Sequence, residues 1–142
     1  MSRVAALDIG TVRIGVALSD PLGIIAQPHA VLRNDPSVFE RIRELCSAQE
    51  VETLVIGLPL RMDGRAGAAV RRSRAFAAEL RRLMPNMTFV EWDERLSSVG
   101  AERVLRDVGK SAKQSRGLSD AIAASLLLEG WLGTRNEERG AR

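Results

Sequence analysis

The stretch LDIGTVRIGVALSD, residues 7–20, decides the fold because it contains two short apolar strands joined by a glycine-containing turn. Side chains alternate along a strand, so Asp8 points to the same side as Val4 and Ala6, among residues of the expected core. A carboxylate in such a place needs a cation, hydrogen-bond donors or access to water. Asp8 therefore either caps the turn at Gly10 with its side chain or binds a ligand.

The composition indicates one domain with a substantial core, since the chain has 142 residues and 45% of them are apolar. The sequence contains no run of 18 apolar residues and no signal-like segment at its start, so we expect a soluble, cytoplasmic protein without a membrane partner. The chain has one cysteine, Cys46, and one histidine, His29, so its composition disfavours an internal disulfide and a zinc site. The formal charge of +3 and the isoelectric point near 9.9 suggest a polyanionic partner.

Hydrophobic periodicity predicts an α/β domain with a mixed central sheet, because a group of three strands is followed by alternating helices and strands. Asp35 and Pro36 suit the start of the first helix. A domain over 1–133 and a polar, mobile tail over 134–142 are expected. The expected strands cover residues 4–9, 14–19, 25–32, 53–57 and 87–92. The first expected helix begins after residue 35, and the others cover residues 69–84, 98–108 and 119–132.

Two further acids lie where such a sheet places its ligands. Glu94 comes just after the strand that ends at residue 92, at the carboxyl end of that strand. Asp120 is in the first turn of the last expected helix and shares a helical face with Ala124 and Leu127. Each acid alone also suits a cap or a helix-dipole charge. Together with Asp8, they would repel one another unless a hard cation such as Mg²⁺ or Mn²⁺ lay between them.

Four motifs, in this order, resemble those of the YqgF/RuvX family of RuvC-like proteins with an RNase H fold. They are DIGTVRIG at 8–15, GLPLRMDG at 57–64, DERLSS at 93–98 and SDAIAA at 119–124, and the likeness covers about residues 3 to 132. The chain departs from the family pattern at Gly100 and Ala121, neither of which is one of the three acids.

The resemblance implies a single RNase H-like domain, with helices on both faces of its sheet, that acts as a metal-dependent nuclease. It implies that Asp8, Glu94 and Asp120 are the catalytic acids and hold one or two Mg²⁺ or Mn²⁺ ions. In this family the activity is connected with maturation of the 5′ end of pre-16S ribosomal RNA and, alternatively, with resolution of Holliday junctions. The expected partners are structured RNA, ribosomal precursor particles or a four-way DNA junction, with the protein a monomer or a homodimer.

Basic residues near the acids suit contacts with a nucleic-acid backbone. Arg13 either contacts phosphate or pairs with an acid such as Asp20. The further candidates for substrate binding are Arg61, Arg65, Arg95, Lys110, Lys113 and Arg116, the last three in an expected loop before Asp120. By contrast, arginines 71, 72, 74, 81 and 82 suit a solvated helix face, with nucleic-acid binding as the alternative.

Two other classes of function remain open from the sequence. Asp8-Ile-Gly-Thr11 also resembles the phosphate loop of the actin, sugar-kinase and Hsp70 ATPases, but those proteins enclose nucleotide between two domains and this chain has the length of one. The other class is a non-catalytic RNA-binding or ribosome-assembly module, in which the acids serve folding alone. A junction resolvase would need two active sites related by a dyad.

Overall fold

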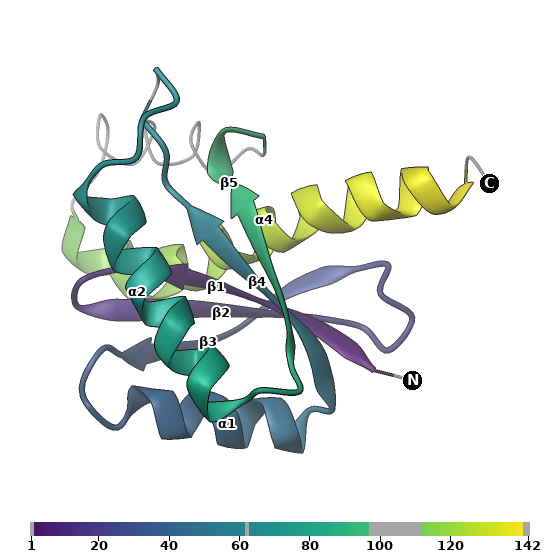
Figure 1. Ribbon diagram of the computed structural model, residues 1–142, viewed down its shortest axis with the longest axis horizontal. Helices are drawn as coiled ribbons and strands as arrows, with labels where there is room; N and C mark the ends of the chain where they lie inside the picture. The colour runs from purple at the N-terminus through teal and green to yellow at the C-terminus, as the bar shows by residue number, and fades with distance from the viewer. Residues whose placement is uncertain (1, 62, 97–111, 141–142) are drawn as a thin grey trace.

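The computed structural model describes residues 2–61, 63–96 and 112–140, with backbone only for 112–119, 139 and 140. A five-stranded sheet in the order β3-β2-β1-β4-β5 forms its centre (Figure 1). The strands are β1 (Arg3–Ile9), β2 (Arg13–Ser19), β3 (Ala26–Arg33), β4 (Val51–Leu58) and β5 (Thr88–Asp93). The helices are α1 (Val38–Ala48), α2 (Ala68–Leu83) and α4 (Ala112–Gly140), and one 3-10 turn, η1 (Glu94–Leu96), follows β5.

The sheet is mixed, as the sequence predicts. β1, β2 and β3 pair antiparallel, whereas β1, β4 and β5 pair parallel. Parallel pairing of β1 with β4 requires a crossover, and α1 supplies it. β1 therefore lies in the middle, between the hairpin partner β2 and the parallel strand β4.

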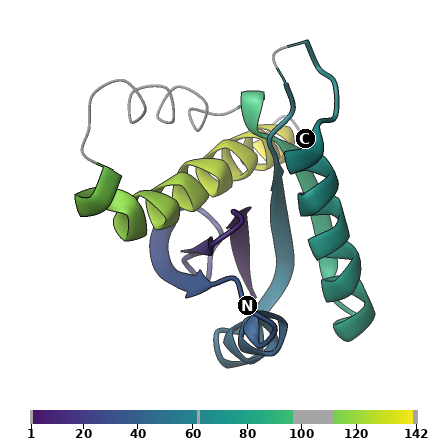
Figure 2. The same cartoon turned by 90° about the vertical axis from the view of Figure 1, so that its left-hand side faces the viewer.

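Helices cover both faces of the sheet (Figure 2). On one face, α1 and α2 pack through residues at helical spacing such as Val38, Ile42, Phe76 and Leu80. On the other face, α4 packs its small and branched residues against Val4, Ala6, Ala17 and Val55. The predicted α/β architecture, a mixed sheet with helices on both faces, is confirmed (Figure 2). No helix in the described part of the chain is long and apolar enough to cross a bilayer.

The edge strand β3 also follows the prediction. Pro28 suggests an edge or a bulge because it lacks an N–H to donate to a neighbouring strand. β3 is at the edge, and its register against β2 shifts where Ala17 faces Pro28 while Val16 faces Ala30. His29 is the extra residue of this bulge.

Two helix boundaries differ from the expectation. α1 begins at Val38 rather than Pro36, because Asp35 accepts hydrogen bonds from the Ser37 backbone N–H, at 3.0 Å, and from Arg41, at 2.6 Å, in a turn that precedes the helix. The last helix begins at Ala112 rather than near Ser119. The expected helix over 98–108 lies outside the described residues.

The expected polar tail is not separate from the last helix, since α4 continues as far as Gly140. Arg135 stacks over Trp131, with its guanidinium carbon 4.8 Å from the ring centroid, and donates to the carbonyl of Gly23 at 3.2 Å. Asn136 donates to the same carbonyl at 3.3 Å. These contacts attach the last turns of α4 to the β2–β3 turn, although the residues themselves are polar.

Candidate active site

Asp8 lies in the central strand with its side chain on the face that α4 covers. The residue is 7% exposed, and it faces Gly15 in the antiparallel pairing of β1 with β2. Its neighbours on the same side of β1, Val4 and Ala6, belong to the core beneath α4, as the alternation predicts. The turn that follows β1 is closed by the Gly10 backbone N–H, which donates to the Arg13 carbonyl at 2.9 Å.

Glu94 approaches Asp8 from the β4 side. It is the first residue of η1 and is 5% exposed. Gly57 makes room for it, because a Cβ atom at Gly57 would lie 2.8 Å from Glu94 Oε1. In the parallel pairing, Leu7 faces Ile56, and Asp8 and Gly57 each follow that pair by one residue. The glutamate side chain therefore lies over the strand beside Asp8.

Asp120 approaches from the opposite side, over β2. A Cβ atom at Gly15 would clash with the carbonyl oxygen of Asp120, so α4 crosses β2 in direct contact with its backbone. Gly15 is the residue that faces Asp8, and this places the start of the buried part of α4 beside the first acid. Deeper in the same helical face, Ala124 and Leu127 are fully buried, as the spacing predicts.

The two glycines are the part of the site that the sequence analysis missed. Gly15 and Gly57 flank Asp8 on the neighbouring strands, and each allows one of the other acids to come close. A glycine inside a strand is itself a signal of close approach by another backbone or a ligand. The signal was present at both positions, but it does not say which segment approaches.

Arg13 pairs with Asp120 and not with Asp20. Its Nε donates to Asp120 Oδ2 at 2.8 Å, and the two side chains are 32% and 23% exposed. Asp20 instead accepts the backbone N–H groups of Ile24 and Ile25, at 2.7 and 2.8 Å, and these bonds lower the pKa of its carboxyl. Of the two alternatives for Arg13, the structure thus shows an acid partner, which is a different acid from the one expected.

The donor chemistry of the three acids fits a hard divalent cation, because carboxylate oxygens are the ligands that Mg²⁺ and Mn²⁺ prefer. In the part of the chain that the structure describes, no three His, Cys, Asp or Glu side chains form a group that could hold a metal ion as they stand. The Asp120 carboxylate is turned toward Arg13. A cation that used all three acids would therefore share the Asp120 carboxylate with this arginine.

Arg95 is held by its neighbour Asp93. Its Nη2 lies 2.7 Å from Asp93 Oδ2, and Nε contacts both carboxylate oxygens at 3.1 Å. This hydrogen bonding lowers the pKa of Asp93 and raises that of Arg95. Asp93 Oδ1 also accepts the backbone N–H of Arg95 at 2.9 Å, which fixes η1 and with it Glu94. Asp93, which is not among the predicted site residues, thus holds the turn that carries Glu94.

The other basic residues predicted to bind substrate lie in different elements. Arg61 and Arg65 are exposed in the loop between β4 and α2, where Arg65 lies 3.6 Å from Asp63. Lys113 and Arg116 belong to the helical backbone of α4, so the expectation that they lie in a loop is wrong. Lys110 lies outside the described residues.

Comparison with known proteins agrees with this architecture. A family model described as "RuvX: Holliday junction resolvase" matches residues 2–134. A protein of Halalkalibacterium halodurans named "Putative pre-16S rRNA nuclease" is 45% identical in an alignment of 134 positions that covers 92% of this chain and 95% of that protein. A protein of Halothermothrix orenii with the same name is 41% identical in an alignment of 140 positions that covers 97% of this chain and 99% of that protein.

Solved structures share the fold at low sequence identity. RuvC of T. thermophilus in complex with a Holliday junction substrate has a TM-score of 0.59 and 12% identity, covering 95% of this chain and 96% of that chain. The Fowlpox virus resolvase in complex with Holliday junction DNA has a TM-score of 0.56 and 8% identity, covering 93% and 97%. With a family match over nearly its whole length and relatives above 40% identity, the chain belongs to the RuvX family.

Proposed function

We propose that this protein is a metal-dependent nuclease that hydrolyses phosphodiester bonds of structured nucleic acid, with the 5′ end of pre-16S ribosomal RNA as its substrate. The observation that carries the proposal is the arrangement around Asp8. Two strand glycines, Gly15 and Gly57, bring the backbone of Asp120 and the side chain of Glu94 to either side of it. Acids gathered from three distant segments suit a shared cation better than a common role in folding.

Asp8, Glu94 and Asp120 would hold one or two Mg²⁺ or Mn²⁺ ions. When bound, such ions activate a water molecule and stabilise the leaving oxygen of a phosphodiester. The hydrolysis forms one bond from phosphorus to the water oxygen and breaks one bond from phosphorus to a ribose oxygen, which takes up a proton. Asp8 contributes a carboxylate on a rigid central strand. Asp93 contributes by fixing the turn that carries Glu94.

The names of the relatives favour ribosomal RNA as the substrate. Proteins at 45% and 41% identity are named as pre-16S rRNA nucleases, whereas the resolvases bound to junction DNA share 12% and 8% identity with this chain. Such a substrate places the work of the protein in the cytoplasm. Holliday-junction resolution is the second candidate, supported by the description of the matching family.

The test compares a precursor 16S rRNA fragment with a four-way DNA junction, each incubated with the protein in Mn²⁺ or in EDTA. The variants are Asp8→Asn and Glu94→Gln, with Glu40→Gln as a matched control, since Glu40 is an exposed acid of α1 that pairs with Arg43. We expect Mn²⁺-dependent cutting of the RNA by the wild type and by Glu40→Gln, and a loss of at least ~100-fold in the two site variants. Circular dichroism and thermal melting verify folding.

If the protein cuts the four-way junction and not the RNA, Holliday-junction resolution replaces pre-16S rRNA maturation as the proposed function. In that case, a protein that stayed monomeric on the junction would contradict the second candidate as well, because resolution needs two sites related by a dyad. If folded protein with bound Mn²⁺ cuts neither substrate, the nuclease proposal fails. The non-catalytic RNA-binding module would then be favoured.

A further inference from the structure

The exposed face of α2 is strongly basic. The helix contains five arginines and one glutamate, which gives it a net charge of +4. Arg71, Arg74 and Arg81 follow one another at intervals of three and seven residues, so they share one face of the helix, and all three are exposed. From Arg71 to Arg81 the helix rises about 15 Å.

This face of α2 contacts the edge strand β5. Arg74 Nε lies 3.6 Å from one carboxylate oxygen of Glu91, and Arg81 Nη2 lies 3.7 Å from the other. The Arg81 guanidinium also lies over the ring of Phe89, with 5.3 Å between its carbon and the ring centroid. The arginines of α2 and the side of β5 that carries Phe89 and Glu91 therefore form one continuous surface.

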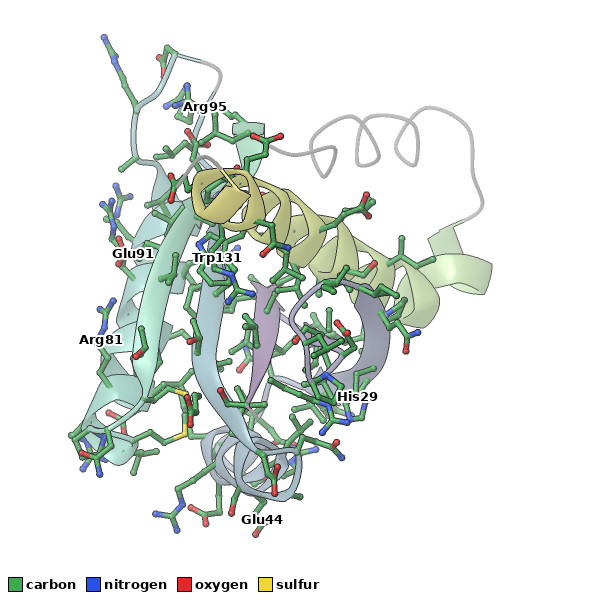
Figure 3. All side chains as sticks on the ribbon, turned by 90° about the vertical axis from the view of Figure 1, so that its right-hand side faces the viewer. His29, Glu44, Arg81, Glu91, Arg95 and Trp131 are labelled. Carbon is green, nitrogen blue, oxygen red and sulfur yellow. The ribbon has the colours of Figure 1, made fainter. Side chains whose placement is uncertain are left out.

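The surface leads toward the candidate site. Figure 3 shows Arg81, Glu91 and Arg95 in this order along one edge of the molecule. Arg95 belongs to η1, the turn that begins with the buried Glu94. We call this surface, formed by Arg71, Arg74, Arg81 and Arg95 with Glu91 between them, the arginine ridge.

Glu91 neutralises Arg74 and Arg81 only weakly. Both distances to Glu91 are too long for good hydrogen bonds, and the side chains involved are 50%, 46% and 31% exposed. Exposed pairs of this kind contribute little and are readily exchanged for a stronger anion. Arg43 on α1 offers a contrast, since it contacts Glu40 at 2.6 Å.

We propose that the arginine ridge binds the phosphate backbone of a double-helical arm of the substrate and guides one strand toward Glu94. The inference rests on the proposed function, because it gives the same site its substrate track. A double helix carries one negative charge per about 1.7 Å of its axis, so the length of the ridge spans several phosphates. Guanidinium groups suit phosphate oxygens because their donors form a planar fork. Recognition by backbone charge also suits a protein with few aromatic residues for base stacking.

The test measures binding without cleavage. Fluorescence anisotropy of a labelled RNA duplex, in EDTA and over a series of salt concentrations, compares the wild type with the double variant Arg74→Gln/Arg81→Gln. We expect the double variant to bind about 10-fold more weakly and the slope of log affinity against log salt to fall by about one for each arginine removed. Arg43→Gln is the matched control and should bind as the wild type does.

The variant Glu91→Gln should change the affinity for the RNA duplex in the opposite direction. Removal of the negative charge between Arg74 and Arg81 should tighten duplex binding several-fold, because both guanidinium groups lose a competing anion. A merely solvated helix face predicts no effect from either change. Thermal melting of each variant separates lost binding from lost folding.

The proposal is overturned if the folded double variant binds the duplex as the wild type does, if Glu91→Gln weakens binding, or if the wild type binds no duplex. The proposal is also overturned if the ridge binds an acidic protein surface and not the RNA duplex. These outcomes are independent of the nuclease proposal. A wild type that binds duplex through the ridge but cuts nothing contradicts the proposed function alone, and unaltered binding by variants of an active nuclease contradicts the ridge alone.

Discussion

Arg13 Nε donates to Asp120 Oδ2 at 2.8 Å, a contact between residues 107 positions apart in the chain. It joins β2 to α4 at the point where the helix crosses Gly15. Arg13 is thus the counterion of one of the three acids proposed to bind metal. The arginine and a divalent cation would compete for the same carboxylate.

Replacement of Arg13 by Gln should therefore raise the affinity for Mn²⁺. The ion pair is partly exposed, and pairs of this kind contribute up to about 1 kcal/mol, so we expect a gain of up to about 5-fold. Isothermal titration calorimetry of Mn²⁺ into both proteins measures it, with Arg43→Gln as the control on α1. Weaker Mn²⁺ binding by Arg13→Gln would mean that the arginine positions Asp120 for the ion instead of competing with it.

Gly15→Ala should destabilise the fold. The new Cβ would clash with the carbonyl oxygen of Asp120, and a backbone atom cannot rotate away as a side chain can. Displacement of α4 should lower the free energy of unfolding by at least about 1–3 kcal/mol, which urea denaturation measures.

Gly133→Ala is the matched control in the same helix, since a Cβ there would meet nothing within 4 Å. Alanine loses less backbone entropy than glycine on folding, so this change should stabilise by about 0.5–1 kcal/mol. Equal effects of the two alanines would contradict the close crossing of α4 over β2.

Gly57→Ala should impair activity more than stability. Its Cβ would meet Leu127 Cδ1 at 2.5 Å and Glu94 Oε1 at 2.8 Å, which are ends of side chains that can move. We expect a loss of about 1–2 kcal/mol in the free energy of unfolding. We also expect a loss of at least ~10-fold in cleavage, because Glu94 is displaced. Full activity in a folded Gly57→Ala protein would show that the position of this carboxylate is unimportant.

Cys46 should be inert in the folded protein. Burial raises the pKa of its thiol to about 12, and the residue is 3% exposed in the core beneath α1. The thiolate is the reactive form, so the folded protein at about pH 8 has roughly a thousandth of the thiolate of an unfolded chain. Reaction with a chromogenic disulfide reagent should be negligible until urea is added. Rapid reaction without denaturant would contradict the packing of α1.

The sequence predicted those parts of the fold that depend on local pattern. Alternation in β1 placed Asp8 on the side of Val4 and Ala6, and the spacing of Ala124 and Leu127 gave the buried face of α4. The helical end of α4 escaped prediction because it contacts Gly23, which is more than 100 residues away in sequence. Polar composition alone gives no sign of such a contact.

The same limit applies to the site. The acids were selected because each is an unusual residue at a sheet end or on an apolar face, which is a local property. The partner of Arg13 and the roles of Gly15 and Gly57 depend on which segment crosses which strand. These relationships exist only in the assembled fold.

The three acids come from β1, from the turn after β5 and from α4, which are the beginning, the middle and the last helix of the chain. Synthesis proceeds from the amino end, so a nascent chain that has emerged only as far as α2 carries Asp8 alone. The proposed metal site, which includes Asp120, cannot be complete until α4 has been translated. In the proposed nuclease, cleavage therefore could not begin before nearly the whole chain has been made.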